Sequence, residues 1–338
     1  MSGQDEKRIE WAFRVASRPD VGGGHVSRCL TLAHALAELG DRVCFVVDDS
    51  GLAWTKTIAG HGHSCVAASA AVATPISACV LDGYDFDAGE IQSWRTRVRT
   101  MVALTDYLPI PEWSDLTFAP AIAPDQVAAG QPTKGKVLTG FEYGLVDRRF
   151  VRTSHRNVPK QVGRILMSFG LRDTRNVTSL ALEALDLLPE IREFGIKIAT
   201  AVGSSAPHLS AVQERVGRMP AASCVVDADL ACHYEQADLL IGGGGVGLLE
   251  RMAQRLPSVS VVMSENQRQQ IALAAAQGGT LDAGRSEDLD ASRLAEIIRP
   301  LLLSDGSRSL LSERSGRLID GMGPHRCALA MWEQVRVH

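Results

Sequence analysis

The chain has 338 residues, of which 45% are hydrophobic and 22% charged, a composition typical of globular proteins and a length sufficient for two domains. Its formal net charge of −4 argues against nucleic acid or an acidic membrane surface as the main partner. The seven cysteines are scattered singly, without the spacing of a metal site or a disulfide framework. The N-terminus lacks the apolar core of a signal peptide, and no apolar run reaches the ~18 residues of a membrane span. We therefore expect a cytoplasmic protein that holds no metal.

The first half of the chain alternates between strand and helix patterns. An apolar run at residues 11–16 predicts a strand, and glycines 22–24 follow it. Apolar residues at helical spacing then predict a helix that ends at Gly40. Further strands are predicted at residues 41–47, 64–67, 78–81, 100–104 and 116–118, with helices at 53–59 and 87–97. This order is typical of an α/β domain with a parallel sheet.

A polar stretch at residues 153–163 is the predicted linker, so we expect one domain over residues 1–158 and another over residues 159–338. In the second half, strands are predicted at 164–168, 197–202, 224–226, 239–241 and 259–262, and a helix follows most of them. A last helix, at 327–335, is assigned to the second domain. The predicted fold is two Rossmann-like, doubly wound domains facing a cleft.

The turn at residues 22–24 carries the strongest local signal. A glycine turn between a strand and a helix directs free backbone N–H groups at an anion or a polar ligand, so Gly23 and Gly24 are candidate binding residues. His25 is the first side chain of the helix, and Arg28 shares its face. The helix N-terminus and the guanidinium disfavour a charged imidazole, which makes His25 a candidate general base. A tight turn without further function is the alternative interpretation.

Three more polar residues fall just beyond predicted strand ends: Asp82, Tyr84 and Asp106. In parallel α/β sheets, ligands gather beyond the carboxyl ends of the strands. We therefore expect these side chains to converge with His25 on one mouth of the sheet.

A second glycine-rich turn, residues 242–245, again joins a strand to a helix. Gly243, Gly244 and Gly245 allow a ligand to approach the backbone closely, and the helix that starts near Val246 favours a phosphate. Glu250, one to two turns into this helix, is placed to accept hydrogen bonds from ribose hydroxyls. The alternative is a solvated helix glutamate.

Neither the Walker A pattern nor the dinucleotide fingerprint is present, so phosphate binding points to a nucleotide-sugar. Gly170 and Asp173, in the turn after the first strand of the second domain, are predicted to face the same cleft. Asn266 and Gln267 follow another strand. Their side chains bind sugar or amide groups, or they cap the next helix.

These motifs, taken together, resemble a known family. Residues 21–33 are similar to the Gly-x-Gly-His-x-x-Arg-Cys-Leu signature of the UDP-2,4-diacetamido-2,4,6-trideoxy-β-L-altropyranose hydrolases of pseudaminic acid biosynthesis. The similarity continues over most of the chain, in residues 82–84, 140–150, 168–173, 237–250 and 264–267. The resemblance implies the GT-B fold, shared with the glycosyltransferase that makes lipid II, and UDP bound mainly by the C-terminal domain.

The resemblance also implies a reaction. Water would attack the anomeric carbon of the UDP-sugar, with His25 as the base and UDP as the leaving group. Asp82, Tyr84 and Asp106 would orient water or sugar, and the N–H groups of residues 242–247 would steady the diphosphate. No cofactor or metal is implied.

Several positions depart from the family pattern. Ala16 and Thr105 stand where the family has acidic residues, Gly83 where it has histidine, and Phe169 where it has glycine. The departures leave open an altered sugar, an acceptor other than water, or lost activity. One alternative is a GT-B glycosyltransferase that transfers a nonulosonic acid or a related sugar to flagellin or a glycan, with an acceptor groove opened beside Gly83 and Thr105. Another is a nucleotide-sugar-binding protein without turnover.

Overall fold

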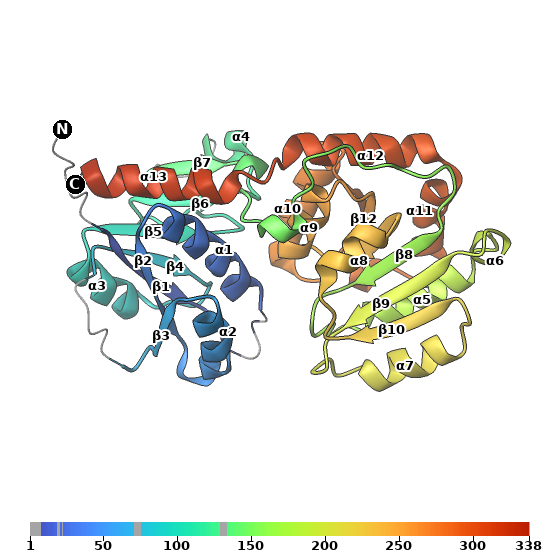
Figure 1. Ribbon diagram of the computed structural model, residues 1–338, viewed down its shortest axis with the longest axis horizontal. Helices are drawn as coiled ribbons and strands as arrows, with labels where there is room; N and C mark the ends of the chain where they lie inside the picture. Colours follow the sequence, from blue (N-terminus) through green and yellow to red (C-terminus); the bar gives the residue numbers. More distant parts are fainter. Residues whose placement is uncertain (1–7, 19–20, 22, 71–75, 129–133, 338) are drawn as a thin grey trace. The chain divides into compact units, whose positions relative to one another are not determined.

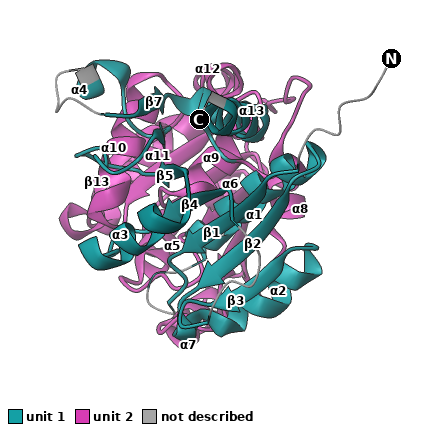
Figure 2. Cartoon of the chain, turned by 90° about the vertical axis from the view of Figure 1, so that its left-hand side faces the viewer, with its two compact units in different colours: residues 1–145, 322–338 teal, residues 146–321 magenta. Residues whose placement is uncertain are grey.

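Each half of the chain folds around its own parallel sheet in the computed structural model, which describes residues 8–18, 21, 23–70, 76–128 and 134–337. Unit 1 comprises residues 1–145 and 322–338, and unit 2 comprises residues 146–321 (Figure 2). The predicted strand-and-helix alternation is confirmed in both halves. Among the described residues, no helix combines the length and the apolar character needed to span a bilayer.

Unit 1 contains seven parallel strands in the order β3-β2-β1-β4-β5-β6-β7. The strands are β1 (Glu10–Val15), β2 (Arg42–Val47), β3 (Ser64–Ala67), β4 (Ala78–Asp82), β5 (Thr100–Leu104), β6 (Leu116–Ala119) and β7 (Lys136–Thr139). Its α-helices are α1 (Gly24–Glu38), α2 (Thr55–Gly60), α3 (Ala88–Arg97), α4 (Pro124–Ala128) and α13 (Gly323–Val337). Strands β4 and β5 are buried at every residue, as expected where helices cover both faces of a parallel sheet.

The last helix of the chain belongs to unit 1. Cys327, Ala328 and Met331 of α13 are fully buried in the same core cluster as Leu32 of α1. The structure therefore differs from the predicted division at residues 158 and 159: the chain enters unit 2 at Val146 and returns to unit 1 at residue 322. The apolar pattern of the helix was visible in the sequence, but it carries no information about which sheet the helix covers.

Unit 2 contains six parallel strands in the order β10-β9-β8-β11-β12-β13, of which Figure 1 shows β10, β9 and β8 side by side. The strands are β8 (Arg164–Ser168), β9 (Lys197–Val202), β10 (Ala222–Val226), β11 (Leu239–Gly242), β12 (Ser258–Val262) and β13 (Leu281–Arg285). The helices are α5 (Val177–Asp186), α6 (Glu190–Glu193), α7 (Leu209–Gly217), α8 (Leu230–Gln236), α9 (Val246–Ala253), α10 (Glu265–Ala276), α11 (Ala291–Leu303) and α12 (Asp305–Leu318).

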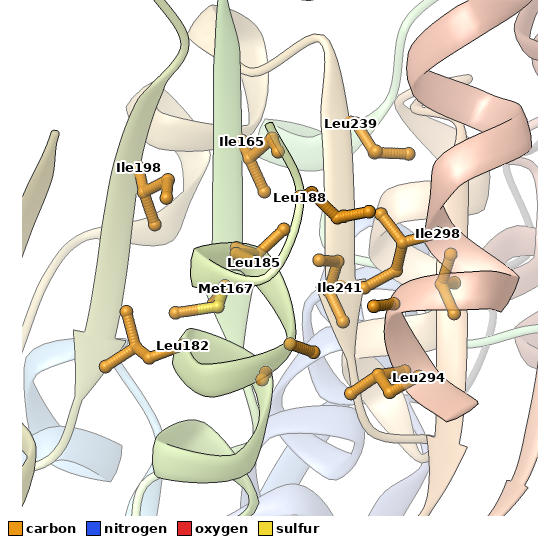
Figure 3. Packing of buried hydrophobic residues seen from close by; sticks show 14 of the residues in the cluster. Ile165, Met167, Leu182, Leu185, Leu188, Ile198, Leu239, Ile241, Leu294 and Ile298 are labelled. Atoms are coloured by element: carbon orange, nitrogen blue, oxygen red, sulfur yellow. The ribbon is translucent and has the colours of Figure 1, made fainter. Parts of the chain in front are cut away.

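The core of unit 2 forms where α5 and α11 cover one face of this sheet (Figure 3). Alternate residues of the strands, such as Ile165 and Met167 of β8, point to this face and are fully buried. Leu182 and Leu185 of α5 pack against them. The strand order reverses between β8 and β11, just as it reverses between β1 and β4 in unit 1, so each sheet has one switch point at which ligands bind in folds of this kind.

Candidate functional site

In unit 1, the candidate site lies at the switch point between β1 and β4. Val15, the last residue of β1, pairs with Asp82, the last residue of β4. Helix α1 begins nine residues after β1 with Gly24, and its N-cap, Gly23, supplies no side-chain cap. His25, the second residue of α1, is thereby placed beside Asp82. Gly22 lies outside the described residues.

His25 and Asp82 form a buried pair. The Nδ1 atom of His25 lies 2.6 Å from Oδ1 of Asp82, and the two residues are 6% and 0% exposed. Because an ionised carboxylate only accepts hydrogen bonds, Nδ1 carries a proton, and in the neutral ring the lone pair is then on Nε2. None of the described residues forms a hydrogen bond with Nε2. The ring is therefore oriented to accept a proton at Nε2.

Arg28 links this pair to a second carboxylate. Its Nε donates to Oδ2 of Asp82 at 2.7 Å, and its Nη1 donates to both oxygens of Asp106, at 2.8 and 2.7 Å. The Tyr84 hydroxyl donates to Asp106 at 2.6 Å, and its ring packs edge-on against His25 with centroids 4.8 Å apart. The structure thus brings together all five residues that the strand-end and helix-start patterns singled out in this domain, while their roles toward a ligand stay predictions.

The charges of this network support one another. Burial raises the pKa of Asp82, but the Arg28 guanidinium and the His25 ring outweigh burial and hold that pKa well below its usual range. Burial lowers the pKa of Arg28, but the charges of Asp106 and Asp82 outweigh burial. The pKa therefore lies above its usual range, and the guanidinium stays charged.

Sequence reasoning missed one member of the network. The Cys29 thiol donates to Oδ2 of Asp82 at 3.2 Å and is fully buried. The signal was present, because Cys29 lies four residues after His25 and therefore shares its helix face.

The groove expected beside Gly83 is not present. A Cβ added to Gly83 would lie 2.7 Å from the Cβ of Ala16 and 2.8 Å from Cζ of Phe86, so these two side chains fill the space that a missing histidine would open. Thr105 is buried, and its hydroxyl donates to the Tyr107 carbonyl at 3.0 Å. The expectation of an opened acceptor groove is corrected accordingly.

In unit 2, the second glycine turn connects β11 to α9 at the corresponding switch point. Gly245 is the N-cap of α9 and has φ of +73°, a conformation that favours glycine. A Cβ on Gly244 would lie 2.8 Å from Cβ of Gln267, so glycine is needed here for close packing against α10. The space where a side chain of residue 244 would lie is occupied by the side chain of Gln267.

The backbone N–H groups of this turn have partners within unit 2. Gly243 donates to the Ser168 carbonyl at 3.3 Å, Gly244 to Oε1 of Gln267 at 3.0 Å, and Gly245 to Oε1 of Gln270 at 2.7 Å. These three N–H groups thus have partners of their own, and their contact with a diphosphate stays a prediction. Val246 and Gly247, in the first turn of α9, are further candidates, because first-turn N–H groups lack intrahelical acceptors. Sequence reasoning missed Gln270, although it lies on the same helix three residues after Gln267.

Glu250 is not a solvated helix residue. It is 9% exposed, and burial together with the Asp147 charge raises its pKa to about 7. The next residue, Arg251, is fully buried and donates to the Gly243 carbonyl at 2.7 Å and to the Ser260 hydroxyl at 2.6 Å. Arg251 therefore fixes the glycine turn from within the core, while Glu250 remains the one ionisable candidate near the start of α9.

The other predicted residues of unit 2 have structural partners. The two oxygens of Asp173 accept the N–H groups of Val177 and Thr178 at 2.9 and 2.8 Å, so this carboxylate caps α5. Asn266 accepts from the Ser264 hydroxyl at 2.5 Å. Gly170 has φ of +83°, which explains its glycine without a ligand. Among the residues described in the two units, no group of His, Cys, Asp and Glu side chains is arranged to hold a metal ion.

No model of a known protein family matches this chain, and no curated protein matches its sequence. Solved structures, in contrast, match it over almost its whole length. A glycosyltransferase from Rickettsia africae has a TM-score of 0.67 at 12% identity and covers 98% of this chain and 99% of its own. A putative UDP-N-acetylglucosamine 2-epimerase from Listeria monocytogenes has a TM-score of 0.66 at 13% identity, with 98% of both chains covered. MnaA of S. aureus, solved with UDP, has a TM-score of 0.68 at 12% identity, again with 98% of both chains covered. At these identities the likeness concerns the fold: the chain has the GT-B fold, with its two parallel α/β units.

Proposed function

We propose that this chain is an enzyme that releases UDP from a UDP-sugar, with water as the attacking group. The observation that carries the proposal is the buried His25–Asp82 pair at the switch point of unit 1, with the lone pair of the ring on Nε2. Names of the matching structures support the substrate class, because they include a UDP complex and a putative UDP-sugar epimerase. The resemblance of residues 21–33 supports the specific substrate, UDP-2,4-diacetamido-2,4,6-trideoxy-β-L-altropyranose, and a place in pseudaminic acid biosynthesis.

In the proposed reaction, Nε2 of His25 takes a proton from water as the water oxygen forms a bond to the anomeric carbon. The bond between that carbon and the β-phosphate oxygen breaks, and its electron pair leaves with UDP. Asp82 stabilises the imidazolium that forms and keeps the ring in place. A base positioned in this way contributes about 10²–10⁴-fold to the rate.

The nucleotide would be bound by unit 2. The first-turn N–H groups of Val246 and Gly247 are the candidates for a phosphate contact, and the dipole of α9 favours negative charge there. Glu250 is the candidate for the ribose hydroxyls. The turn that presents these groups is held by Arg251 and Gln270.

Transfer to an acceptor hydroxyl is the second candidate, because several matching structures are named as glycosyltransferases. In that case His25 would take the proton from a hydroxyl of flagellin or of a glycan, and the sugar would be a nonulosonic acid or a related sugar. The filled space beside Gly83 favours water, since Ala16 and Phe86 occupy the place where an acceptor groove was expected. If no product forms, the remaining alternative is a nucleotide-sugar-binding protein without turnover.

The test is to incubate the protein with the UDP-trideoxyhexose in water enriched in ¹⁸O and to follow the products by NMR and mass spectrometry. We expect UDP and the free sugar, with the label on the anomeric oxygen. Label on the phosphate would show attack at phosphorus and contradict the proposed base. Product that forms only with a glycan or flagellin present would establish transfer, and UDP binding without product would establish the non-catalytic alternative.

A further inference from the structure

One turn of α1 holds a single buried carboxylate with three of its side chains. His25, Arg28 and Cys29 are three and four residues apart, so they project from one face of the helix. Their donors meet on Asp82: His25 Nδ1 lies 2.6 Å from Oδ1, which also accepts from Arg28 Nη2, whereas Arg28 Nε and Cys29 Sγ lie 2.7 and 3.2 Å from Oδ2. The proposed reaction uses the imidazole and needs the guanidinium as a countercharge, but it assigns no part to the thiol.

The Cys29 thiol is placed as a hydrogen-bond donor. Cys29 and Asp82 are both fully buried. Burial and the Asp82 charge raise the pKa of Cys29 well above its usual range, so the sulfur keeps its proton and is not a nucleophile at neutral pH. Because an ionised carboxylate accepts and cannot donate, the S–H group must point to Oδ2.

We propose that Cys29 is a positioning residue whose thiol, together with Arg28 Nε, fixes Oδ2 of Asp82 so that Oδ1 stays aligned with Nδ1 of His25. The inference rests on the proposed function, because it treats His25 as the base. With two donors on Oδ2, the carboxylate cannot turn about its Cβ–Cγ bond without breaking both contacts. The thiol also takes up part of the carboxylate charge, which leaves the imidazolium less stabilised and Nε2 free to accept a proton.

The effect of Cys29 on His25 must pass through Asp82. Charged or titratable groups surround the ring from three places: Arg28 and Cys29 on α1, Asp82 and Tyr84 at and after the end of β4, and Asp106 after β5. Of the other four groups, only Asp82 contacts the Cys29 thiol, whereas Arg28, Tyr84 and Asp106 keep their hydrogen bonds to one another when Cys29 is changed.

Two substitutions distinguish the effect of losing the hydrogen-bond donor from the effect of changing the side-chain volume. Cys29→Ala removes the donor, and we expect kcat to fall about fivefold, the value of one weak hydrogen bond, with KM within about twofold. Cys29→Ser keeps a donor and should return kcat to within about twofold of the wild type. The matched control is Cys79→Ala, since Cys79 is also fully buried, in β4, but its thiol faces the Val80 carbonyl at 3.6 Å. Should Cys29→Ala not fold, Cys29→Val, which has no donor and a similar volume, gives the same comparison.

Two measurements on the ligand-free protein test the inference without turnover. The first is the ¹⁵N NMR titration of His25, whose midpoint we expect to move to higher pH by about half a unit in Cys29→Ala and to stay in place in Cys79→Ala. The second is the infrared S–H stretching band that Cys29→Ala removes, which we expect at lower frequency than the band removed by Cys79→Ala.

An unchanged His25 titration in Cys29→Ala, or a Cys29 band at the frequency of a free thiol, would overturn the inference. Equal kcat values for Cys29→Ala and the wild type would do the same. If the wild-type protein releases no UDP from any UDP-sugar but the titration shifts as expected, then the proposed function fails and the positioning role of Cys29 stands.

Discussion

The two switch points of this molecule are built in opposite ways. At the end of β1 and β4 in unit 1, side chains of different strands and of α1 meet one another, and Nε2 of His25 has no hydrogen-bond partner among the described residues. At the end of β8 and β11 in unit 2, the glycine turn is closed by its own glutamines and arginine. The first arrangement holds a reactive group in place, whereas the second holds a backbone in place. Substitutions at each switch point test this contrast.

The largest effect is expected for His25. The His25→Gln variant should lose about 10²–10⁴-fold in kcat, because the base is gone, and should bind UDP within about threefold of the wild type. We would measure kcat from the rate of UDP release and the affinity for UDP by calorimetry. His61→Gln is the control, since His61 is exposed and lies outside the site. Equal rates for the His25 variant and the wild type would remove the imidazole from the mechanism.

Asp82→Asn should destabilise the protein by about 3 kcal/mol, because it leaves Arg28 with less compensation for its burial. The pKa of Asp82 is lowered in the folded state, so its contribution is complete above about pH 4 and is lost as the pH falls further. Urea unfolding at pH 7 and at pH 3 measures both effects. A variant as stable as the wild type at pH 7 would show that the carboxylate contributes little to the fold.

Glu250→Gln should stabilise unit 2 in mildly alkaline solution. Burial raises the pKa of Glu250 to about 7, above its value in the unfolded chain, so the carboxyl destabilises the fold increasingly as the pH rises from about 4 to about 7. We expect the variant to gain about 2–3 kcal/mol over the wild type at pH 8 and little at pH 4. Unfolding of both proteins across this range tests it, and a gain independent of pH would contradict the assignment.

The smallest effect is expected for Gln270→Met, which removes the acceptor for the Gly245 N–H. We expect UDP affinity to fall about threefold, because the turn loses one hydrogen bond that fixes it. Gln277→Met, at the exposed end of α10, is the control. Tighter UDP binding in Gln270→Met would mean that the glutamine competes with the diphosphate for that N–H group, and the two switch points would then be more alike than they look.

The sequence predicted more of unit 1's site than of unit 2's. His25, Asp82 and Asp106 were found because polar residues at strand ends of a parallel sheet meet at one edge, whatever the details of packing. The partner of the Gly245 N–H could not be found in this way, because Gln270 is twenty-five residues away and its side-chain direction depends on how α10 packs.

The same limit applied to two larger features. Phe86 fills the space beside Gly83 only because the turn after β4 folds back on Ala16, which no periodicity indicates. Strand β13 was not predicted, since its sequence lacks a continuous apolar run. Helices α11 and α12 were not predicted as separate elements either, although Leu294, Ile298 and Leu301 of α11 recur at helical spacing.

The return of the chain to unit 1 has a consequence for biosynthesis. The ribosome completes the seven strands of the first sheet by residue 139, but the helix that covers Leu32 and its neighbours is translated only after all of unit 2. The nascent chain must carry that uncovered apolar surface while all of unit 2 is being made. A premature stop near residue 320 would therefore leave the N-terminal sheet without its cover, and such a fragment is a natural target for chaperones and proteases.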